Sequence, residues 1–563
     1  MTAKEQFELW LSKAEGAILE ELKTVSTDAE IERRFGTVQK FGTAGIRCEM
    51  GAGSSLLNDY TVRRVARGLA QYMLTGGVKK SCAIGYDSRH NSRRFAEIAA
   101  QALAAEGVKV YLYDRLCPTP MLSFAVRHLH CGAGIVVSAS HNTKEYNGIK
   151  CYGDDGCQMT EVPAAAVSAN IDALDYFTPD KAAFSDLLAS GKIEYIGADV
   201  WQAYYDTVSA QLVAPEKIAK ADLSVVYSPL CGAGGEPVNF MLKKYGAKVS
   251  VPESQAKPSG DFATCPSPNP ENDAAFAEAF KLADQVKPDI VLVTDPDSDR
   301  IACAVWDGAQ YTKLTGNEMG CLLLDYIFRS GKTPKTPVTV QSIVSSPMAA
   351  KIAASYGADV RITPTGFKYI GATILELEAQ KRPNDFVFGF EESCGYLKGT
   401  YCRDKDAVLA ATLISEMAAD YKIAGKTLLQ AIAELYDKFG YTTAALQNIV
   451  FTTPEIRAKC AAKLEQIKHD PPSDVAGIKV LTATDFSVGE VLDLATGKRT
   501  AIDCPKENML RLELDGGARV ILRPSGTEPK MKLYYTAASD VSLADARALA
   551  SRLQDGMTAW LDA

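Results

Sequence analysis

The stretch that decides the fold is residues 82–113, CAIGYDSRHNSRRFAEIAAQALAAEGVKVYLY. Its apolar start, Cys82–Tyr86, predicts a buried strand, and the apolar positions spaced through Arg93–Ala105 predict a helix. Gly107 is placed to end that helix, because glycine readily adopts the left-handed backbone found after helix C-termini. Val108–Tyr113 then has the β-branched and aromatic content of a second strand. The order strand, helix, strand is typical of an α/β domain.

The junction between helix and strand occurs three times along the chain. Gly107-Val-Lys-Val110, Gly246-Ala-Lys-Val249 and Gly357-Ala-Asp-Val360 each follow a predicted helix and start a predicted strand. Around the first copy, the alternation continues through a helix at 118–129 and a strand at 134–137. Three copies so far apart predict three related α/β domains.

The C-terminal part of the chain has a different pattern. Arg519–Leu522 and Met531–Tyr535 are predicted strands, and Ser542 with Asp545 forms a capping box for a final helix. We therefore expect a smaller α+β domain there. The predicted organisation is α/β with mixed sheets, in domains at residues 1–205, 206–310, 311–440 and 441–563. Residues 4–24 are predicted to form one amphipathic helix.

Composition excludes several classes of protein. A chain of 563 residues is too long for one core, and its net charge of −8 argues against a nucleic-acid-binding protein. No stretch is long and apolar enough to cross a bilayer, and Met1–Trp10 lacks the apolar core of a signal peptide. The fourteen cysteines are scattered without a Cys-x-x-Cys motif, which argues against zinc. We expect a reduced cytoplasmic enzyme, whose oligomeric state the sequence does not indicate.

Three carboxylates follow a predicted strand, Ile290–Thr294. Asp295, Asp297 and Asp299 stand at alternate positions, so a curved loop can bring them to one ion. Gathered carboxylates repel unless a cation neutralises them, and oxygen-only ligands select Mg²⁺, Ca²⁺ or Mn²⁺. Taken alone, the run can also be an acidic surface turn. An EF-hand is excluded, because Arg300 stands where that loop needs glycine.

A hydroxyl group is placed at the end of another buried strand. In Val137-Ser-Ala-Ser140-His141-Asn142, Ser140 can carry a phosphoryl group to a metal site, although a strand-end cap is the simpler reading of the serine alone. Asn147-Gly-Ile-Lys150 is predicted to be a turn that returns a lysine to the same place. The glycine-rich Phe41–Arg47 is predicted to be a loop, and it matches neither a P-loop nor a dinucleotide fingerprint.

Further polar loops suit a sugar phosphate. Glu391, Glu392 and Ser393 leave the predicted strand 386–388 and can accept hydrogen bonds from sugar hydroxyls, although a polar strand-exit turn has the same composition. Arg523-Pro-Ser525-Gly526-Thr527 has the donors of a phosphate-binding loop. Positive charge and glycine-rich turns are also supplied by two other segments, with Arg403 and Lys405 in one and Thr365, Gly366 and Lys368 in the other.

In this order along the chain, the motifs resemble one family, the α-D-phosphohexomutases. The resemblance rests on Gly42–Arg47, Ser138–Asn142, Asp295–Arg300, Glu391–Ser393 and Arg523–Pro529. The length, Leu314–Glu318 and Lys405-Asp406 look like the long branch of phosphoglucomutases and phosphopentomutases. The chain departs from the usual Thr-Ala-Ser-His-Asn-Pro pattern of the family at Ser138 and at Thr143, which stands in place of proline.

The resemblance implies four domains around a cleft and a role for each motif. It implies that Ser140 is the phosphoserine and that it binds Mg²⁺ together with Asp295, Asp297 and Asp299. It implies that Arg47 and Lys150 assist proton transfer and that His141 orients the serine or the substrate. The implied substrate-binding residues are Arg300, Thr365, Gly366, Lys368, Glu391, Ser393, Arg403, Lys405, Arg523, Ser525, Gly526 and Thr527.

The function implied by this resemblance is the interconversion of glucose 1-phosphate and glucose 6-phosphate through glucose 1,6-bisphosphate. Lys150 can act as a base only if neighbouring cations lower its pKa. Within the family, the alternatives are a phosphopentomutase acting on ribose phosphates and a phosphomannomutase. Outside the family, a metal-dependent sugar phosphatase would use the same aspartates and transfer the phosphoryl group to water. A non-catalytic sugar-phosphate-binding protein is a further alternative, but it would not need Ser140 and all three aspartates, and all four residues are present.

Overall fold

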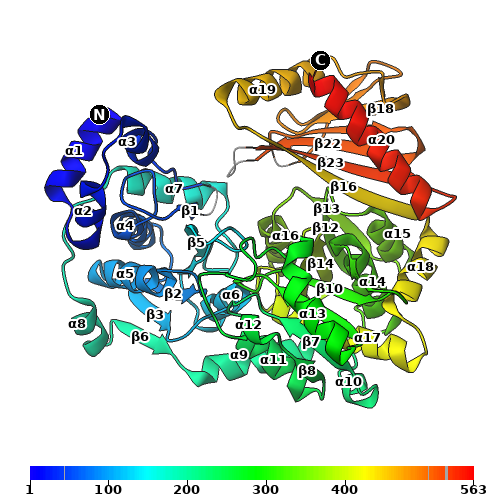
Figure 1. Ribbon diagram of the computed structural model, residues 1–563, viewed down its shortest axis with the longest axis horizontal. Helices are drawn as coiled ribbons and strands as arrows, with labels where there is room; N and C mark the ends of the chain where they lie inside the picture. Colours follow the sequence, from blue (N-terminus) through cyan, green and yellow to red (C-terminus); the bar gives the residue numbers. More distant parts are fainter. Residues whose placement is uncertain (43–44, 505, 526–529, 563) are drawn as a thin grey trace.

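The computed structural model describes residues 1–42, 45–504, 506–525 and 530–562. The expected fold class is confirmed: three α/β domains with mixed sheets precede a C-terminal domain built on an antiparallel sheet. In Figure 1 the first domain, coloured blue to cyan, lies on the left. The green and yellow second and third domains lie on the right, and the orange and red fourth domain lies above the third.

The first domain has a six-stranded sheet of order β1-β5-β4-β2-β3-β6. The last four of these strands are parallel to one another, whereas β5 runs antiparallel to both β4 and β1. The hairpin from β4 to β5 therefore carries the predicted serine loop at its tip. The strands are β1 (Gly45–Glu49), β2 (Ser81–Tyr86), β3 (Lys109–Tyr113), β4 (Ala133–Val137), β5 (Tyr146–Gly153) and β6 (Ile193–Ile196).

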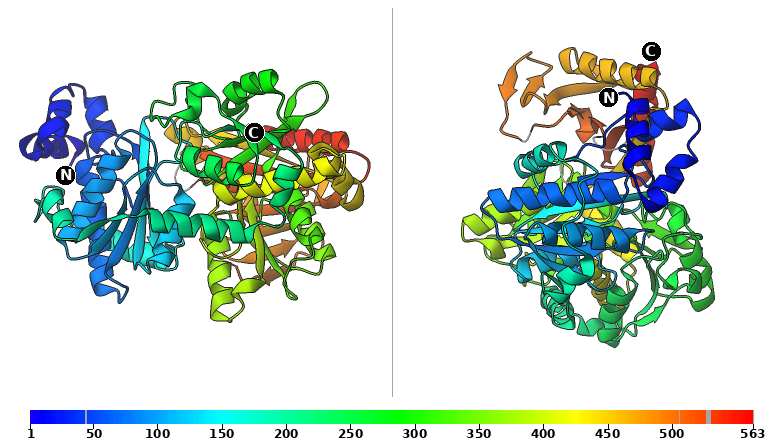
Figure 2. Two further views of the ribbon diagram at one scale, coloured as in Figure 1. Left: turned by 90° about the horizontal axis from the view of Figure 1, so that it is seen from below. Right: turned by 90° about the vertical axis from the view of Figure 1, so that its left-hand side faces the viewer.

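Helices cover both faces of this sheet, as Figure 2 shows. Cys82 and Ile84 of β2 pack into the core formed with α4 and α5, while Ala83 between them packs into the core formed with α6. That second core continues without a break into the second and third domains. The helices are α4 (Asp59–Thr75), α5 (Ser92–Ala105), α6 (Thr119–His128), α7 (Glu161–Asp172), α8 (Phe184–Ala189) and α9 (Ala198–Gln211).

The second domain has a five-stranded sheet of order β11-β10-β9-β7-β8. Its strands are β7 (Ser224–Ser228), β8 (Lys248–Ser250), β9 (Ile290–Thr294), β10 (Ile301–Trp306) and β11 (Tyr311–Leu314). The pairing of β10 with β11 places this sheet across the boundary expected at residue 310. Its helices are α10 (Glu216–Lys220), α11 (Gly235–Lys244), α12 (Glu253–Ala256), η1 (Asp273–Phe276) and α13 (Ala277–Val286).

The third domain has a four-stranded sheet of order β13-β12-β14-β15. Its strands are β12 (Val338–Ser342), β13 (Asp359–Thr363), β14 (Phe386–Glu391) and β15 (Gly395–Lys398). The hairpin between β14 and β15 carries the predicted sugar-binding motif. Its helices are α14 (Gly316–Arg329), α15 (Pro347–Ser355), α16 (Phe367–Ala379), η2 (Pro383–Asp385), α17 (Ala407–Ile423) and α18 (Leu428–Phe439).

The fourth domain folds around an antiparallel sheet of order β16-β23-β22-β21-β18-β19-β20, with β17 paired to β18. Its strands are β16 (Tyr441–Val450), β17 (Asp474–Val475), β18 (Ile478–Asp485), β19 (Glu490–Asp493), β20 (Arg499–Ala501), β21 (Leu510–Leu514), β22 (Arg519–Pro524) and β23 (Lys530–Ser539). The remaining elements are α19 (Pro454–His469), η3 (Asp515–Gly517) and α20 (Leu543–Asp562). Ser542 accepts the amide N–H of Asp545 at the start of α20, as the capping motif predicted.

The three repeated glycines have the backbone that the sequence predicted. The φ angles of Gly107, Gly246 and Gly357 are 98°, 84° and 76°, a region that residues with a side chain rarely adopt. Each glycine leads from a helix into β3, β8 or β13. Each α/β domain therefore contains one helix that ends at such a glycine and leads into a strand.

Three local predictions are wrong. Residues 4–24 form two helices, α1 (Ala3–Lys13) and α2 (Gly16–Lys23), because Ala14 is extended and Gly16 has a φ of 59°. They pack with α3 (Asp28–Phe35) around Trp10. Asn147–Lys150 belongs to strand β5 instead of a turn. The loop predicted over residues 41–47 is wrong at its end, because Gly45–Arg47 belong to strand β1.

The cysteines and the lengths of the helices agree with what the sequence predicts. Every cysteine is a free thiol, and all but Cys504 are buried. Within the described part of the chain, no helix combines the length and the apolar character needed to cross a membrane.

Candidate active site

The serine loop leaves β4 and turns tightly before β5. Ser140 is 3% exposed and has a φ of 52°, a left-handed conformation that is unusual for serine. Its amide N–H donates to the Ser138 hydroxyl at 2.8 Å, and that hydroxyl donates to Asp87 at 2.6 Å. Ser138, which stands where the family that the motifs resemble has threonine, therefore supports the turn through its hydroxyl group. The turn aims the side chain of Ser140 away from its own sheet and toward the second domain.

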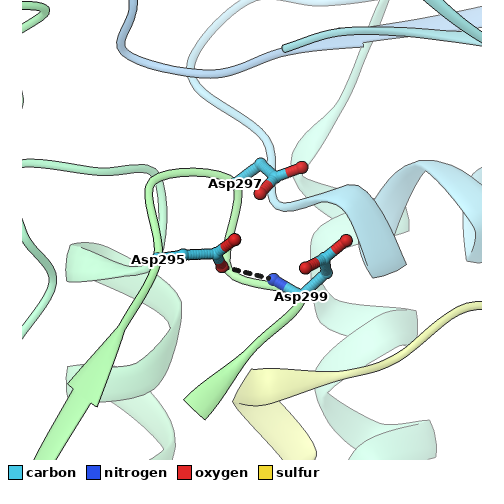
Figure 3. A group of neighbouring side chains, drawn as sticks. All are labelled: Asp295, Asp297 and Asp299. Carbon is cyan, nitrogen blue, oxygen red and sulfur yellow. Dashed lines mark hydrogen bonds between the residues drawn. The ribbon is translucent and has the colours of Figure 1, made fainter. Parts of the chain in front are cut away.

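The carboxylate loop follows β9 and meets this serine. Oδ1 of Asp295 accepts the amide N–H groups of Asp299 and Arg300, both at 3.1 Å, which curls the chain into a compact loop (Figure 3). Ser140 donates its hydroxyl proton to Oδ2 of Asp295 at 2.7 Å. Two loops that are 155 positions apart in the sequence are therefore in direct contact.

Two lysines reach the same carboxylates from other domains. Nζ of Lys150, on β5, lies 2.6 Å from Oδ2 of Asp297 and 3.6 Å from Oδ2 of Asp299. Nζ of Lys405, from the third domain, lies 2.9 Å from Oδ2 of Asp299. Thr119 at the start of α6 donates its hydroxyl to Asp297 at 2.8 Å. Three domains thus supply one charged cluster.

The carboxylate cluster has the chemistry of a divalent-cation site. One oxygen from each of Asp295, Asp297 and Asp299 lies within 4.8 Å of the others, and all three residues are buried. Among the described residues, Oδ1 of Asp297 and Oδ1 of Asp299 are buried without a hydrogen-bond partner, although buried carboxylate oxygens are normally paired. An oxygen-only donor set with unpaired lone pairs fits Mg²⁺ or Mn²⁺.

The pKa values in the cluster have opposing directions. Burial and the negative charges of Asp297 and Asp299 raise the pKa of Asp295 well above its usual range. Burial also opposes ionisation of Asp297, but Lys150 overcomes that effect and lowers its pKa. Burial lowers the pKa of Lys150, yet the attraction of Asp297 and Asp299 outweighs it and raises that pKa. In this arrangement Lys150 is protonated, so the lowered pKa that a base requires is not present.

Positively charged and polar groups surround Ser140. Nδ1 of His141 lies 3.2 Å from Oγ of Ser140. Burial, Arg300 and Arg47 all lower the pKa of His141 well below its usual range. Arg47 donates to the side-chain oxygen of Asn142 at 3.3 Å, and Arg300 forms an ion pair with Glu271 at 2.7 Å.

The predicted sugar-binding residues meet in the third domain. Oε1 of Glu391, at the end of β14, accepts the amide N–H of Gly366 at 2.6 Å. Gly366 has a φ of 122° immediately before α16. The hydroxyl of neighbouring Thr365 is buried and has no hydrogen-bond partner within the part of the chain that the structure describes. Ser393 lies in the turn between β14 and β15. Burial and then the charge of Glu391 raise the pKa of Glu392 to about 7.

Two predicted substrate-binding cations have protein partners. Nζ of Lys368 lies 2.5 Å from Glu161 in the first domain. The Arg403 side chain is fully buried, forms an ion pair with Glu378 and donates to the carbonyl of Thr400. In the structure, the contacts of Arg403 are thus with Glu378 and Thr400, and its predicted role in substrate binding stays a prediction.

The phosphate-loop prediction is only partly covered by the structure. Nε of Arg523, on β22, lies 3.4 Å from Oε2 of Glu507. Glu507 in turn accepts the hydroxyl of Tyr369, on α16, at 3.0 Å. Ser525 follows β22, whereas Gly526 and Thr527 lie outside the described residues.

Sequence reasoning missed several residues at this site. Thr119 contacts Asp297, Asp404 contacts Lys405 at 3.0 Å, and Glu271 contacts Arg300. Arg89 lies beneath the serine loop and binds its carbonyl oxygens. The one available signal was that Asp87-Ser-Arg89 follows a buried strand directly, in the same way as the recognised motifs do.

Comparisons with known proteins cover nearly the whole chain. Family models described as "Phosphoglucomutase/phosphomannomutase, alpha/beta/alpha domain" I, II and III match residues 38–177, 202–308 and 315–439. The model of the C-terminal domain of the same family matches residues 455–551.

Similar proteins have related names. A phosphoglucomutase of Staphylococcus epidermidis is 34% identical over 94% of this chain and 96% of its own. One of Staphylococcus aureus is 35% identical over 94% of this chain and 95% of its own. The solved structure of parafusin, a phosphoglucomutase from Paramecium, superposes with a TM-score of 0.69 at 17% identity, covering 93% of this chain and 96% of that one. A phosphoglucomutase/phosphomannomutase family protein from Burkholderia thailandensis superposes with a TM-score of 0.67 at 18% identity, covering 93% and 98%.

Proposed function

Because the chain belongs to the phosphoglucomutase/phosphomannomutase family, we propose that it interconverts glucose 1-phosphate and glucose 6-phosphate. The protein is a mutase, an enzyme that moves a phosphoryl group between positions of a sugar phosphate. Glucose is supported as the sugar by the curated relatives, which are named phosphoglucomutase.

One contact carries the proposal. The hydroxyl of Ser140 lies 2.7 Å from Asp295, inside a cluster of three buried carboxylates that also holds two lysines. A serine that only caps a strand does not need a second domain to gather charge around its oxygen. The arrangement suits a serine that carries a phosphoryl group, because phosphoryl transfer depends on positioning and on neutralising charge.

The reaction occurs in two transfers. In the first, the free hydroxyl of the bound sugar phosphate attacks the phosphorus on Ser140, the bond from phosphorus to Oγ breaks, the attacking hydroxyl loses its proton and Oγ gains one. In the second, the bisphosphate has turned round, and Oγ of Ser140 attacks its other phosphorus. The bond from that phosphorus to the sugar oxygen breaks, the serine hydroxyl loses its proton, and the freed sugar oxygen gains one. Glucose 1,6-bisphosphate is therefore both the intermediate and the activator that phosphorylates an unmodified enzyme.

The charged residues have separate tasks. Lys150 and Arg47 assist the proton transfers, with Lys150 in its protonated form in the described arrangement, and His141 orients the serine oxygen. Asp295, Asp297 and Asp299 would hold Mg²⁺ together with Ser140, and the ion would neutralise charge on the transferred phosphoryl group. Lys405 adds positive charge beside the same cluster.

Substrate recognition is divided between two domains. Glu391 accepts hydrogen bonds from sugar hydroxyls, and Ser393 can accept or donate them. The neighbouring Thr365, Gly366 and Lys368 also contribute to binding the substrate. Arg523, Ser525, Gly526 and Thr527 bind the phosphate that is not reacting. Because the residues that bind sugar hydroxyls are separate from those that bind the second phosphate, the bisphosphate can bind in both orientations.

The test compares three substrates in one assay. Glucose 1-phosphate, mannose 1-phosphate and ribose 1-phosphate are converted with glucose 1,6-bisphosphate and Mg²⁺ present, and kcat/KM is measured for each. The proposal expects glucose 1-phosphate to have the highest value. A higher value for ribose or mannose 1-phosphate would identify a phosphopentomutase or a phosphomannomutase instead. Release of inorganic phosphate as the main product would identify a phosphatase.

A further inference from the structure

A buried arginine lies directly beneath the serine loop. Arg89 follows β2, and its side chain is fully buried. Nη1 donates to the carbonyl oxygens of Thr143 at 2.8 Å and Tyr146 at 3.1 Å. Nη2 donates to the carbonyl oxygens of Ser140 and Asn142. One guanidinium group therefore binds four carbonyl groups of the loop that carries Ser140.

The guanidinium group is itself held from two sides. Nε of Arg89 lies 3.4 Å from Oδ2 of Asp87, and the amide N–H of Arg89 donates to Oδ1 of that residue at 2.9 Å. The Phe262 ring, from the second domain, stacks on the guanidinium with its centre 4.9 Å away. Asp87 also accepts the hydroxyl of Ser138, which receives the amide N–H of Ser140. Asp87 and Arg89 thus fix the loop through both its N–H and its carbonyl groups.

The serine loop needs such support because its backbone conformation is unfavourable without contacts from the rest of the protein. Ser140 has a φ of 52°, which residues other than glycine seldom adopt without constraint from their surroundings. Thr143 stands where the family's usual pattern has proline, so the backbone there lacks the restriction that a proline ring imposes. A planar guanidinium group has donors at fixed angles and can serve four acceptors, whereas a lysine ammonium offers three donors from a single atom.

We propose that Arg89 is a positioning residue for phosphoryl transfer: it fixes the serine turn, and through the turn it aims Oγ of Ser140 at the reacting phosphorus. This inference rests on the proposed function, in which Ser140 carries the phosphoryl group. Arg89 has no contact with the sugar in this role, so its loss changes the rate of transfer and leaves substrate affinity almost unchanged. A displacement of about 1 Å at a reacting atom lowers rates about 10²-fold.

The test uses Arg89→Lys with Arg93→Lys as the matched control. Arg93 lies on the next helix, α5, has a side chain 64% exposed and pairs with Glu97. For Arg89→Lys we expect kcat to fall about 10²-fold while KM stays within about threefold of the wild-type value. The rate at which glucose 1,6-bisphosphate phosphorylates Ser140, followed by intact mass in a single turnover, should fall by the same factor. Arg93→Lys should match the wild type.

A purely structural role predicts a different pattern. In that case Arg89→Lys lowers the melting temperature, but the folded enzyme retains its kcat and its rate of Ser140 phosphorylation, and the inference is overturned. If Arg89→Lys does not fold, Asp87→Asn weakens the support of the guanidinium while leaving its four carbonyl contacts. It should lower kcat about tenfold at unchanged KM, and an unchanged kcat would equally overturn the inference.

Ser140→Ala separates the two levels of the proposal. An inactive Ser140→Ala enzyme beside a fully active Arg89→Lys enzyme would contradict only the role of Arg89. An active Ser140→Ala enzyme would contradict the proposed function on which that role rests.

Discussion

Replacement of Asp297 by asparagine tests the metal site in the most quantitative way. The substitution keeps the size of the side chain and one ligand oxygen but removes one of three gathered negative charges. It also removes the charge that holds Lys150 at 2.6 Å, so that lysine would repel an incoming cation without compensation. At about 4 Å and an effective dielectric constant of about 20, the attraction lost per unit of cation charge is about 4 kcal/mol, and Mg²⁺ carries two units. Binding of Mg²⁺ should therefore weaken by at least about 10³-fold.

Two assays measure this loss independently. Titration calorimetry with Mn²⁺ reports binding directly, and activity in a series of Mg²⁺ buffers reports the concentration needed for half-maximal turnover. Asp284→Asn is the matched control, because Asp284 lies on α13 with a side chain 67% exposed. The control should bind Mn²⁺ like the wild type. If Asp297→Asn binds Mn²⁺ within about threefold of the wild type, the carboxylates do not form a metal site and the electrostatic reasoning is refuted.

Two further predictions concern other parts of the fold. Burial raises the pKa of Glu416 to about 7, so the folded protein retains a proton that the unfolded chain releases near pH 4.5. The contribution of Glu416 to the free energy of unfolding should therefore fall by about 3 kcal/mol as pH rises from about 4.5 to 7. The melting temperature of Glu416→Gln should fall less over that range than that of the wild type; an identical fall would contradict the assignment. Glu507 pairs with Arg523 at 3.4 Å, so Glu507→Gln should release that arginine for a substrate phosphate and lower KM about threefold, and a raised KM would contradict this competition.

The sequence predicted the elements that depend on local rules. Gly107, Gly246 and Gly357 marked the three α/β domains because a left-handed residue after a helix favours glycine. The spacing of Asp295, Asp297 and Asp299 predicted that their side chains converge, because a tight loop after a strand can bring residues at alternate positions to one point. These signals lie within a few residues of one another, so they remain visible without a structure.

The errors arose where tertiary packing overrode a local signal. Asn147-Gly148 is a typical turn sequence, yet it lies in β5 between β4 and β1. There Gly148 is required by close packing, because a Cβ atom would lie 2.7 Å from the carbonyl oxygen of Ile46 and 2.8 Å from that of Ser138. Glycine in a strand is often a sign of close approach of two backbones, which is its role here.

Contacts between distant segments could not be read from the sequence. Arg403 is predicted to add positive charge to the cleft, and its ion pair with Glu378 is visible only in the structure. Arg89 received no role, because its four acceptors are carbonyl groups that carry no sequence signature. The contact of Thr119 with Asp297 joins two domains, so it too could not be predicted from the sequence.

The central claim is that Ser140 carries the phosphoryl group. The most direct measurement is the intact mass of the purified enzyme after incubation with glucose 1,6-bisphosphate and Mg²⁺, followed by mapping of the modified peptide. We predict one added phosphoryl group per chain, located on Ser140, lost on addition of glucose 1-phosphate and absent from Ser140→Ala, which should have no mutase activity. Phosphorylation at another residue, or full activity in Ser140→Ala, would contradict the account.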